Sequence, residues 1–164
     1  MGEGRSEAGG LSRAAHGASA EGGARWLRCA LVVFALLPML ALVARGVTIL
    51  HPVATLFERV FALHCHRDPS RALALLDHPF PVCARCLGLY AGCGVAAAWS
   101  GAVPAEGPRR AWVFAAALAM LLDVAREHSF GGTPVSALRF VTGLALALPI
   151  ALGLLAALLP RRST

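Results

Sequence analysis

Four long apolar segments are the feature that most constrains the fold of this chain. About 20 apolar residues in a helix cross the hydrocarbon core of a bilayer, where a helix satisfies its own backbone hydrogen bonds. The chain is 57% hydrophobic and only 15% charged, whereas a soluble domain carries about 25% charged residues. We therefore predict an all-α integral membrane protein, a helical bundle with about four transmembrane spans: 29–50, 86–103, 111–125 and 138–159.

The start of the chain has a different composition. Residues 1–24 are rich in Gly, Ala, Ser and mixed charge and have no apolar period, so we predict a disordered tail there. The first apolar segment lies too far along the chain, and is too long, for an ordinary signal peptide, so we interpret it as an uncleaved anchor. Residues 25–160 then form a single transmembrane helical domain.

A loop over residues 51–85 is predicted to join the first two spans. Its first part, 52–63, has apolar residues at helical spacing with charged residues between them. This pattern predicts an amphipathic, interfacial helix at the membrane surface. Asp68 followed by Pro69 resembles an N-cap and a first helical position, which predicts a short helix over 71–76.

Arginine supplies all the basic side chains, because the chain has a net charge of +6 and contains no lysine. The tail, the 104–110 loop and the C-terminus contain eight of the 15 arginines. Because these include the tight pairs at 109–110 and 161–162, we predict that both termini face the cytoplasm. The arginines form no stripe with interleaved aromatic residues, so the expected partner is the lipid bilayer rather than a nucleic acid.

A Cys-His pair at 65–66 and a Cys-Ala-Arg-Cys motif at 83–86 lie in the loop between the first two spans. Thiolate and imidazole bind borderline metals, and a helix N-terminus beside an arginine favours the thiolate form. The motifs therefore predict a site for zinc or another transition metal. Its predicted ligands are Cys65, His66, Cys83 and Cys86, with His64 and His78 as alternatives to His66.

Two other interpretations of the cysteines stay open. Cys83 and Cys86 have the spacing of the redox dithiol in a membrane thiol–disulfide oxidoreductase, with Cys65 as the resolving thiol. Alternatively, the cysteines form a plain disulfide or are incidental in a membrane scaffold or transporter component. The sequence lacks a nucleotide-binding fingerprint, and Leu87 follows the motif where c-type haem attachment requires histidine. No enzymatic activity is predicted.

Polar residues near the later spans are expected on the same side of the membrane as the cysteine loop. Asp123 lies near the end of the third span, an Arg-Glu-His triplet follows at 126–128, and Arg139 lies at the start of the fourth. Such groups are costly in a membrane unless they pair or serve a function. We expect them to support the cysteine site, although a structural lock between Asp123 and Arg126 or Arg139 is an alternative. The predicted supporting residues are Arg71, Arg85, Asp123 and Arg139.

Small residues recur every four positions along the second and fourth spans. This spacing creates a face that lets two helices approach closely, either within one chain or between the chains of a homo-oligomer. The residues are Gly88, Gly92, Ala96 and Ser100 on the second span and Thr142, Gly143, Ala147 and Ala151 on the fourth.

The cysteine motifs carry a resemblance to a known family. The Cys-His-Arg-Asp-Pro-Ser-Arg run at 65–71 and the Pro-Val-Cys-Ala-Arg-Cys-Leu-Gly run at 81–88 resemble a predicted membrane-protein family called domain of unknown function 2085. Asp123 and the Arg-x-x-Thr-Gly run at 139–143 are similar to later features of that family. The resemblance implies that the cysteines, His66 and Arg85 act as one unit, and it implies no established activity.

Overall fold

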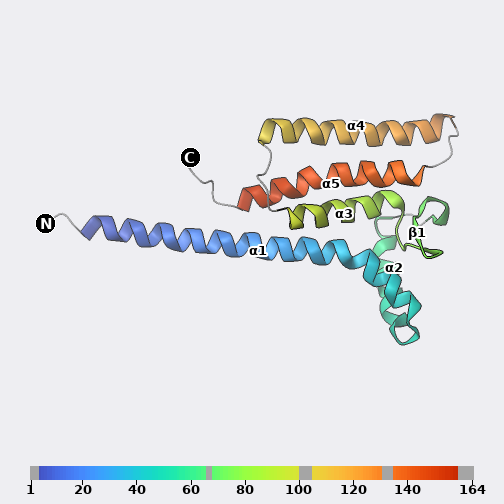
Figure 1. The fold of residues 1–164 in the computed structure, drawn as a ribbon, viewed down its shortest axis with the longest axis horizontal. Helices are drawn as coiled ribbons and strands as arrows, with labels where there is room; N and C mark the ends of the chain where they lie inside the picture. Colours follow the sequence, from blue (N-terminus) through green and yellow to red (C-terminus); the bar gives the residue numbers. More distant parts are fainter. Residues whose placement is uncertain (1–3, 66–67, 100–104, 131–134, 159–164) are drawn as a thin grey trace.

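The computed structural model describes residues 4–65, 68–99, 105–130 and 135–158. The predicted all-α class is confirmed, with one small β-hairpin in addition. Figure 1 shows α3, α4 and α5 side by side, with α1 running along α3 and extending beyond it. The helices in chain order are α1 (Gly4–Gly46), η1 (Thr48–Leu50), α2 (His51–Ala62), η2 (Pro69–Arg71), α3 (Ala84–Ala98), α4 (Glu106–Phe130) and α5 (Ser136–Leu158).

Within the described residues, two helices are long and apolar enough to cross a membrane. They are Gly22–Gly46, the later part of α1, and Ser136–Leu158, which is α5. The first ends before the predicted residue 50, because Gly46 is followed by a 3₁₀ turn instead of further α-helix. The second corresponds to the predicted fourth span.

The other two predicted spans are not established by the structure. α3 has 15 residues, so it is about 22 Å long and shorter than a hydrocarbon core of about 30 Å. α4 has 25 residues, but arginines precede its apolar stretch and Asp123, Arg126 and Glu127 interrupt or follow it. The four-span bundle is therefore not confirmed.

The predicted disordered tail differs from the structure, because α1 begins at Gly4. The difference has a physical reason in helix cooperativity. Starting a helix is costly, but extending one that an apolar segment has already formed adds a hydrogen bond for each residue ordered. The alanines scattered through residues 4–24 favour this extension.

The loop between α1 and α3 contains the predicted amphipathic helix but not the predicted short one. α2 buries Ala54 and Phe61 and leaves several apolar residues on its other side exposed. The segment 71–76 contains instead strand β1 (Ala74–Leu75), which pairs antiparallel with β2 (His78–Pro79).

The turn of this hairpin explains why no helix forms there. Leu76 and Asp77 both have positive φ, at 50° and 63°, a backbone conformation that joins hairpin strands and cannot continue a right-handed helix. Ahead of it, the Asp68 carboxylate accepts hydrogen bonds from both the backbone N–H and the hydroxyl of Ser70, which limits the helical start to one 3₁₀ turn.

The small-residue faces of α3 and α5 pack against each other within one chain. A Cβ added at Gly92 would lie 2.8 Å from the Leu144 carbonyl oxygen. A Cβ added at Gly88 would overlap the Phe140 carbonyl oxygen, and one at Gly143 would overlap the Arg85 carbonyl oxygen. This close packing fixes the start of α3, where two of the cysteines lie, against the polar start of α5.

We expect Gly88→Ala to destabilise the protein by roughly 1–3 kcal/mol, because backbone atoms cannot move aside as a flexible side chain would. Thermal unfolding in detergent measures the effect. Gly107→Ala is the matched control, because a Cβ there meets nothing within 4 Å. Equal unfolding temperatures for the two variants would contradict the close α3–α5 packing.

Candidate metal centre

The two cysteine motifs are brought together where α2 ends and α3 begins. The backbone N–H of Cys65 still donates to the Phe61 carbonyl oxygen at 2.9 Å, so Cys65 closes the last turn after α2. Cys83 is the N-cap of α3, and Cys86 lies in the first turn of that helix. The three Sγ atoms all lie within 4.8 Å of one another.

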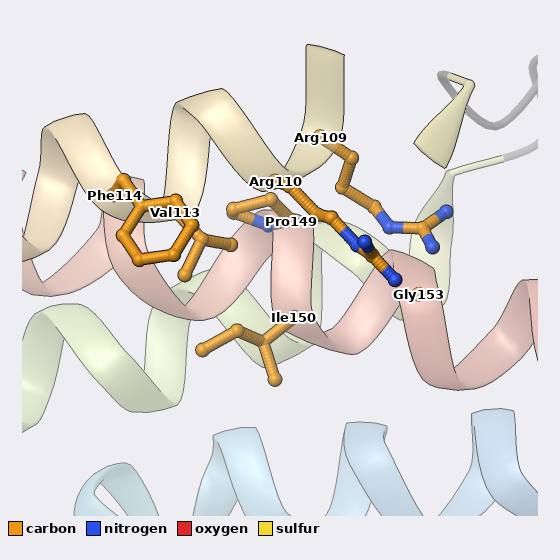
Figure 2. A pocket seen from close by; sticks show the side chains of 7 residues that line it. All are labelled: Arg109, Arg110, Val113, Phe114, Pro149, Ile150 and Gly153. Carbon is orange, nitrogen blue, oxygen red and sulfur yellow. The ribbon is translucent and has the colours of Figure 1, made fainter. Parts of the chain in front are cut away.

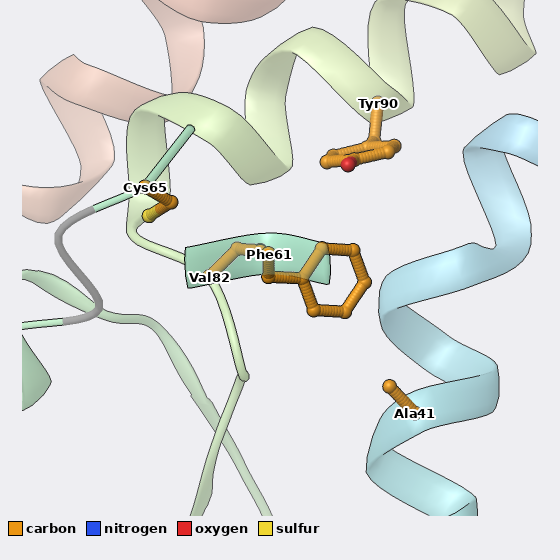
Figure 3. Packing of buried hydrophobic residues seen from close by; sticks show 5 residues of the cluster. All are labelled: Ala41, Phe61, Cys65, Val82 and Tyr90. Atoms are coloured by element: carbon orange, nitrogen blue, oxygen red, sulfur yellow. The ribbon is translucent and has the colours of Figure 1, made fainter. Parts of the chain in front are cut away.

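An apolar cluster holds Cys65 in this position. Phe61 and Val82 are both 0% exposed, and Cys65 is 7% exposed. Figure 3 shows the Phe61 ring facing Tyr90 of α3 and Ala41 of α1, with Cys65 and Val82 nearby. Burial of Phe61 therefore fixes the end of α2 against α1 and α3, and the position of Cys65 follows from it.

The sulfur geometry is compatible with three thiolates that bind one metal ion. All five cysteines of the chain, each within the described ranges, are thiols. Three thiolates bound to one zinc ion at about 2.3 Å lie about 3.8 Å apart in a tetrahedral site. The described separations allow that arrangement after small side-chain rotations. The backbone N–H of Cys83 also donates to Cys65 Sγ at 3.2 Å, a contact that stabilises negative charge on the sulfur.

A cavity of about 510 Å³ opens beside the sulfur atoms. Helices α4 and α5 each contribute to its wall, as do both cysteine segments. Six of the residues predicted for the site line it together: Cys65, Cys83, Cys86, Arg71, Arg85 and Arg139. The predicted supporting residue Asp123 lies behind this wall, bound to Arg85.

The histidines named as alternative ligands have different positions. His64 lines the cavity, and its Nε2 atom lies 3.0 Å from the Tyr90 hydroxyl oxygen. His78 lies on β2 and lines a separate cavity with Arg45 and Pro79. His66, the predicted fourth ligand, lies outside the described residues.

Asp123 is the centre of a buried ion-pair network. This carboxylate is 5% exposed and lies 2.6 Å from Arg85 Nη2. Arg126 Nη2 lies 3.5 Å from it and Arg139 Nε 3.8 Å. Since Arg85 lies between the two cysteines of α3, the network joins the cysteine segment to α4 and α5. The predicted lock between Asp123 and the arginines of α4 and α5 is present, and Arg85 is its nearest member.

Glu127 extends the network towards the loop. Its carboxylate pairs with Arg139 and, at 2.7 Å, with Arg71 Nη2. Arg71 Nε in turn lies 3.1 Å from the Asp68 carboxylate. Hydrogen bonds from Ser70 hold the pKa of that carboxyl below its ordinary value, so it carries its negative charge at neutral pH.

The sequence predicted Glu127 only as part of the polar triplet at 126–128, without its partners, and it did not identify Tyr90 as a site residue. A usable signal for Glu127 was its spacing, because residues 123 and 127 are four apart and lie on one face of a helix. Tyr90 has the same relation to Cys86, one turn earlier in α3.

The network leaves two buried donors without hydrogen bonds. The Nε atoms of Arg85 and Arg139 have no hydrogen-bond partner among the described residues. The described part of the network contains four guanidinium groups and three carboxylates, from Arg71, Arg85, Arg126, Arg139, Asp68, Asp123 and Glu127. Arg85, which lies between Cys83 and Cys86 in the sequence, brings this network next to the sulfur atoms.

The fold and the site together define a helical membrane protein with a cysteine cluster and a partly buried arginine network at one end of its helices. The chain belongs to the family of predicted membrane proteins named DUF2085, whose model matches residues 65–153. The match begins at the first cysteine of the cluster and extends through most of α5.

The chain is also similar to an uncharacterized protein of Methanothermobacter thermautotrophicus. The two sequences are 50% identical over 32 residues, which is 20% of this chain and 29% of the relative. The comparison thus spans less than a third of that relative's length. No solved structure is significantly similar to the chain.

Proposed function

We propose that the protein binds a transition metal, with zinc as the best-suited ion, through Cys65, Cys83 and Cys86. The observation that carries the proposal is the proximity of the three Sγ atoms, all within 4.8 Å of one another although they come from two separate segments. Soft thiolate ligands at this spacing suit zinc and similar ions. His66, which follows Cys65 directly, is the proposed fourth ligand.

Two local interactions favour the thiolate form that metal binding requires, whereas hydrogen bonding with the Cys65 and Cys83 thiols and burial raise the pKa of Cys86 in the metal-free protein. Cys83 and Cys86 lie at the N-terminus of α3, where the helix dipole favours negative charge. Cys65 Sγ accepts a backbone hydrogen bond from Cys83. Each of these interactions stabilises a thiolate more than a neutral thiol.

We also propose that the centre faces the extracytoplasmic side. In Figure 1 the start of α1, the start of α4 and the end of α5 lie at one end of the molecule, and α2 and the hairpin lie at the other. The arginine-rich flanks belong to the first end, which the positive-inside rule assigns to the cytoplasm.

Elemental analysis of the detergent-purified protein, prepared without air or chelator, tests the metal proposal. We expect about one metal ion per chain, reduced at least tenfold in each of the variants Cys65→Ser, Cys83→Ser and Cys86→Ser. Cys93→Ser is the matched control, because Cys93 lies on the same helix but outside the sulfur cluster.

The same samples separate the competing interpretations. A metal-free protein with a reversible Cys83–Cys86 disulfide would contradict the proposal and identify a thiol–disulfide oxidoreductase. A metal-free protein with unreactive thiols would identify a scaffold or transporter component. Metal that persists in all three variants would show that other residues bind it.

A further inference from the structure

Helix α2 has two apolar faces, and only one of them is covered by other helices. Its residues Ala54 and Phe61 are buried, and Phe61 packs against Ala41 of α1 and Tyr90 of α3. The second apolar face continues from η1 through α2, and we call it the outer face. Its residues recur at alternating steps of four and three along the sequence, so they lie on one side of a helix. They are Ile49, Val53, Leu56, Val60 and Leu63, which are between 44% and 86% exposed.

The exposed polar side chains of α2 form a third face. His51, Thr55 and Arg59 recur every four residues, and all three are exposed. Because a helix turns by about 100° per residue, this polar face is directed away from both the buried face and the outer face. A helix with one side on the protein, one polar side and one uncovered apolar side suits the boundary between water and lipid.

We propose that the outer face of α2 is inserted into the interfacial region of the lipid bilayer, with the polar face towards water. Monomeric soluble proteins seldom expose large continuous apolar patches, because contact of apolar surface with water is costly. The chain belongs to a family of predicted membrane proteins, so lipid is the apolar partner at hand. α2 also follows Gly22–Gly46, a helix long and apolar enough to cross a membrane, after only one 3₁₀ turn.

The outer face continues a series of exposed apolar residues that begins on α1. Arg45 pairs with Glu58 at 2.6 Å, so α2 runs beside the last turns of α1. Val43 and Val47, which lie in and directly after those turns, are 55% and 41% exposed. Lipid around the end of α1 therefore meets exposed apolar residues up to the start of the outer face.

The direction of α2 fits a position along the membrane surface. Figure 1 shows α2 at a steep angle to α3 and α5, at the end of the row of helices where the hairpin lies. Helices that cross a bilayer are tilted by about 20° on average from its normal. With α5 close to the normal, α2 therefore lies closer to the membrane plane.

The ends of α5 give the levels of the two membrane surfaces. α5 has 23 residues and is about 35 Å long, slightly more than a hydrocarbon core of about 30 Å. Figure 2 shows the guanidinium groups of Arg109 and Arg110 extending towards Gly153, near the end of α5, where they mark one polar boundary. The start of α5 packs against the start of α3 and so lies near the other boundary, beside Cys65 and the end of α2.

A second copy of the chain is the competing occupant of the outer face, because a spacing of four and three residues also occurs in coiled coils. A coiled-coil seam is sustained over at least about three to four heptads, whereas residues 49–63 span about two. The length of the outer face therefore favours lipid.

Tryptophan fluorescence in phosphatidylcholine bilayers with brominated acyl chains tests the proposal, because bromine quenches a tryptophan only on close contact. The native tryptophans, Trp26, Trp99 and Trp112, are first replaced by phenylalanine in the full chain, so that one introduced reporter remains. We expect Leu56→Trp to lose at least about half of its emission in brominated lipid, because an interfacial helix buries its apolar face by about 5–10 Å. Thr55→Trp, at the neighbouring position on the polar face, is the matched control and should lose little emission.

Leu63→Trp is a second reporter on the outer face, at a position that is 86% exposed, and thermal unfolding in detergent checks that each variant is folded. Equal emission of both outer-face reporters with and without bromine would overturn the proposal, and a dimer in the same samples would then identify a second copy as the occupant. Equal quenching of Thr55→Trp and Leu56→Trp would also overturn it, because lipid would then surround α2 on every exposed side.

Discussion

Asp123→Asn is expected to lower the free energy of unfolding by about 3–5 kcal/mol. The carboxylate is 5% exposed and lies among Arg85, Arg126 and Arg139. Removing its charge leaves the guanidinium groups of Arg85 and Arg139, which are largely buried, with mutual repulsion. Asparagine has nearly the same size as aspartate. The decrease in the free energy of unfolding therefore reports the loss of the negative charge and not a change in packing.

Thermal or denaturant unfolding in detergent measures this effect. The matched control is Glu106→Gln, which makes the same chemical change in the exposed Arg110–Glu106 pair. Exposed pairs contribute about 0–1 kcal/mol, so the control should unfold almost like the native protein. If the two variants lost equal stability, Asp123 would not be the centre of a buried network.

Removal of the metal should loosen residues 68–83 while α3 and α5 stay intact. Apart from Pro81 and Val82 near its end, this segment has little apolar burial to hold it in place, because it consists of one 3₁₀ turn and two short, exposed strands. A metal at 100 times its dissociation constant stabilises the bound form by about 2.7 kcal/mol. Amide hydrogen exchange in the segment should therefore become about 100-fold faster after chelation.

Hydrogen exchange followed by mass spectrometry makes the comparison within one sample. The close-packed glycine contacts of α3 and α5 give an internal reference whose exchange should not change. A Cys83→Ser/Cys86→Ser variant should exchange fast with or without chelator. Identical protection of 68–83 before and after chelation of the native protein would mean that no metal holds the segment.

The helices were predictable because a long apolar segment in a membrane protein has few alternatives to a helix. The residues at which the helices end were not predictable. The end of α1 depends on Gly46 and on the turn that follows it. The hairpin depends on positive φ at Leu76, a residue type that seldom adopts it and whose side chain is 85% exposed. Neither feature leaves a periodic signal in the sequence.

The sulfur atoms of the candidate metal site were predictable from the sequence. The pairing of the charged side chains around them was less predictable. Cys83 and Cys86 follow from their spacing on one helix turn, whereas the approach of Cys65 depends on burial of Phe61, a long-range contact. Asp123 was identifiable as a charge inside an apolar helix. Glu127 was expected near the site, but its pairing was not predictable, because its partners Arg71 and Arg139 are 56 and 12 residues away and meet it only in the folded chain.

X-ray absorption spectroscopy at the edge of the bound metal tests the central claim most directly, because it counts the sulfur atoms around the ion. We expect three sulfur neighbours at about 2.3 Å for zinc and one lighter nitrogen or oxygen neighbour. The Cys86→Ser variant, if it retains any metal, should lose one sulfur neighbour. A coordination shell of nitrogen and oxygen alone would contradict the assignment of Cys65, Cys83 and Cys86 as the metal ligands.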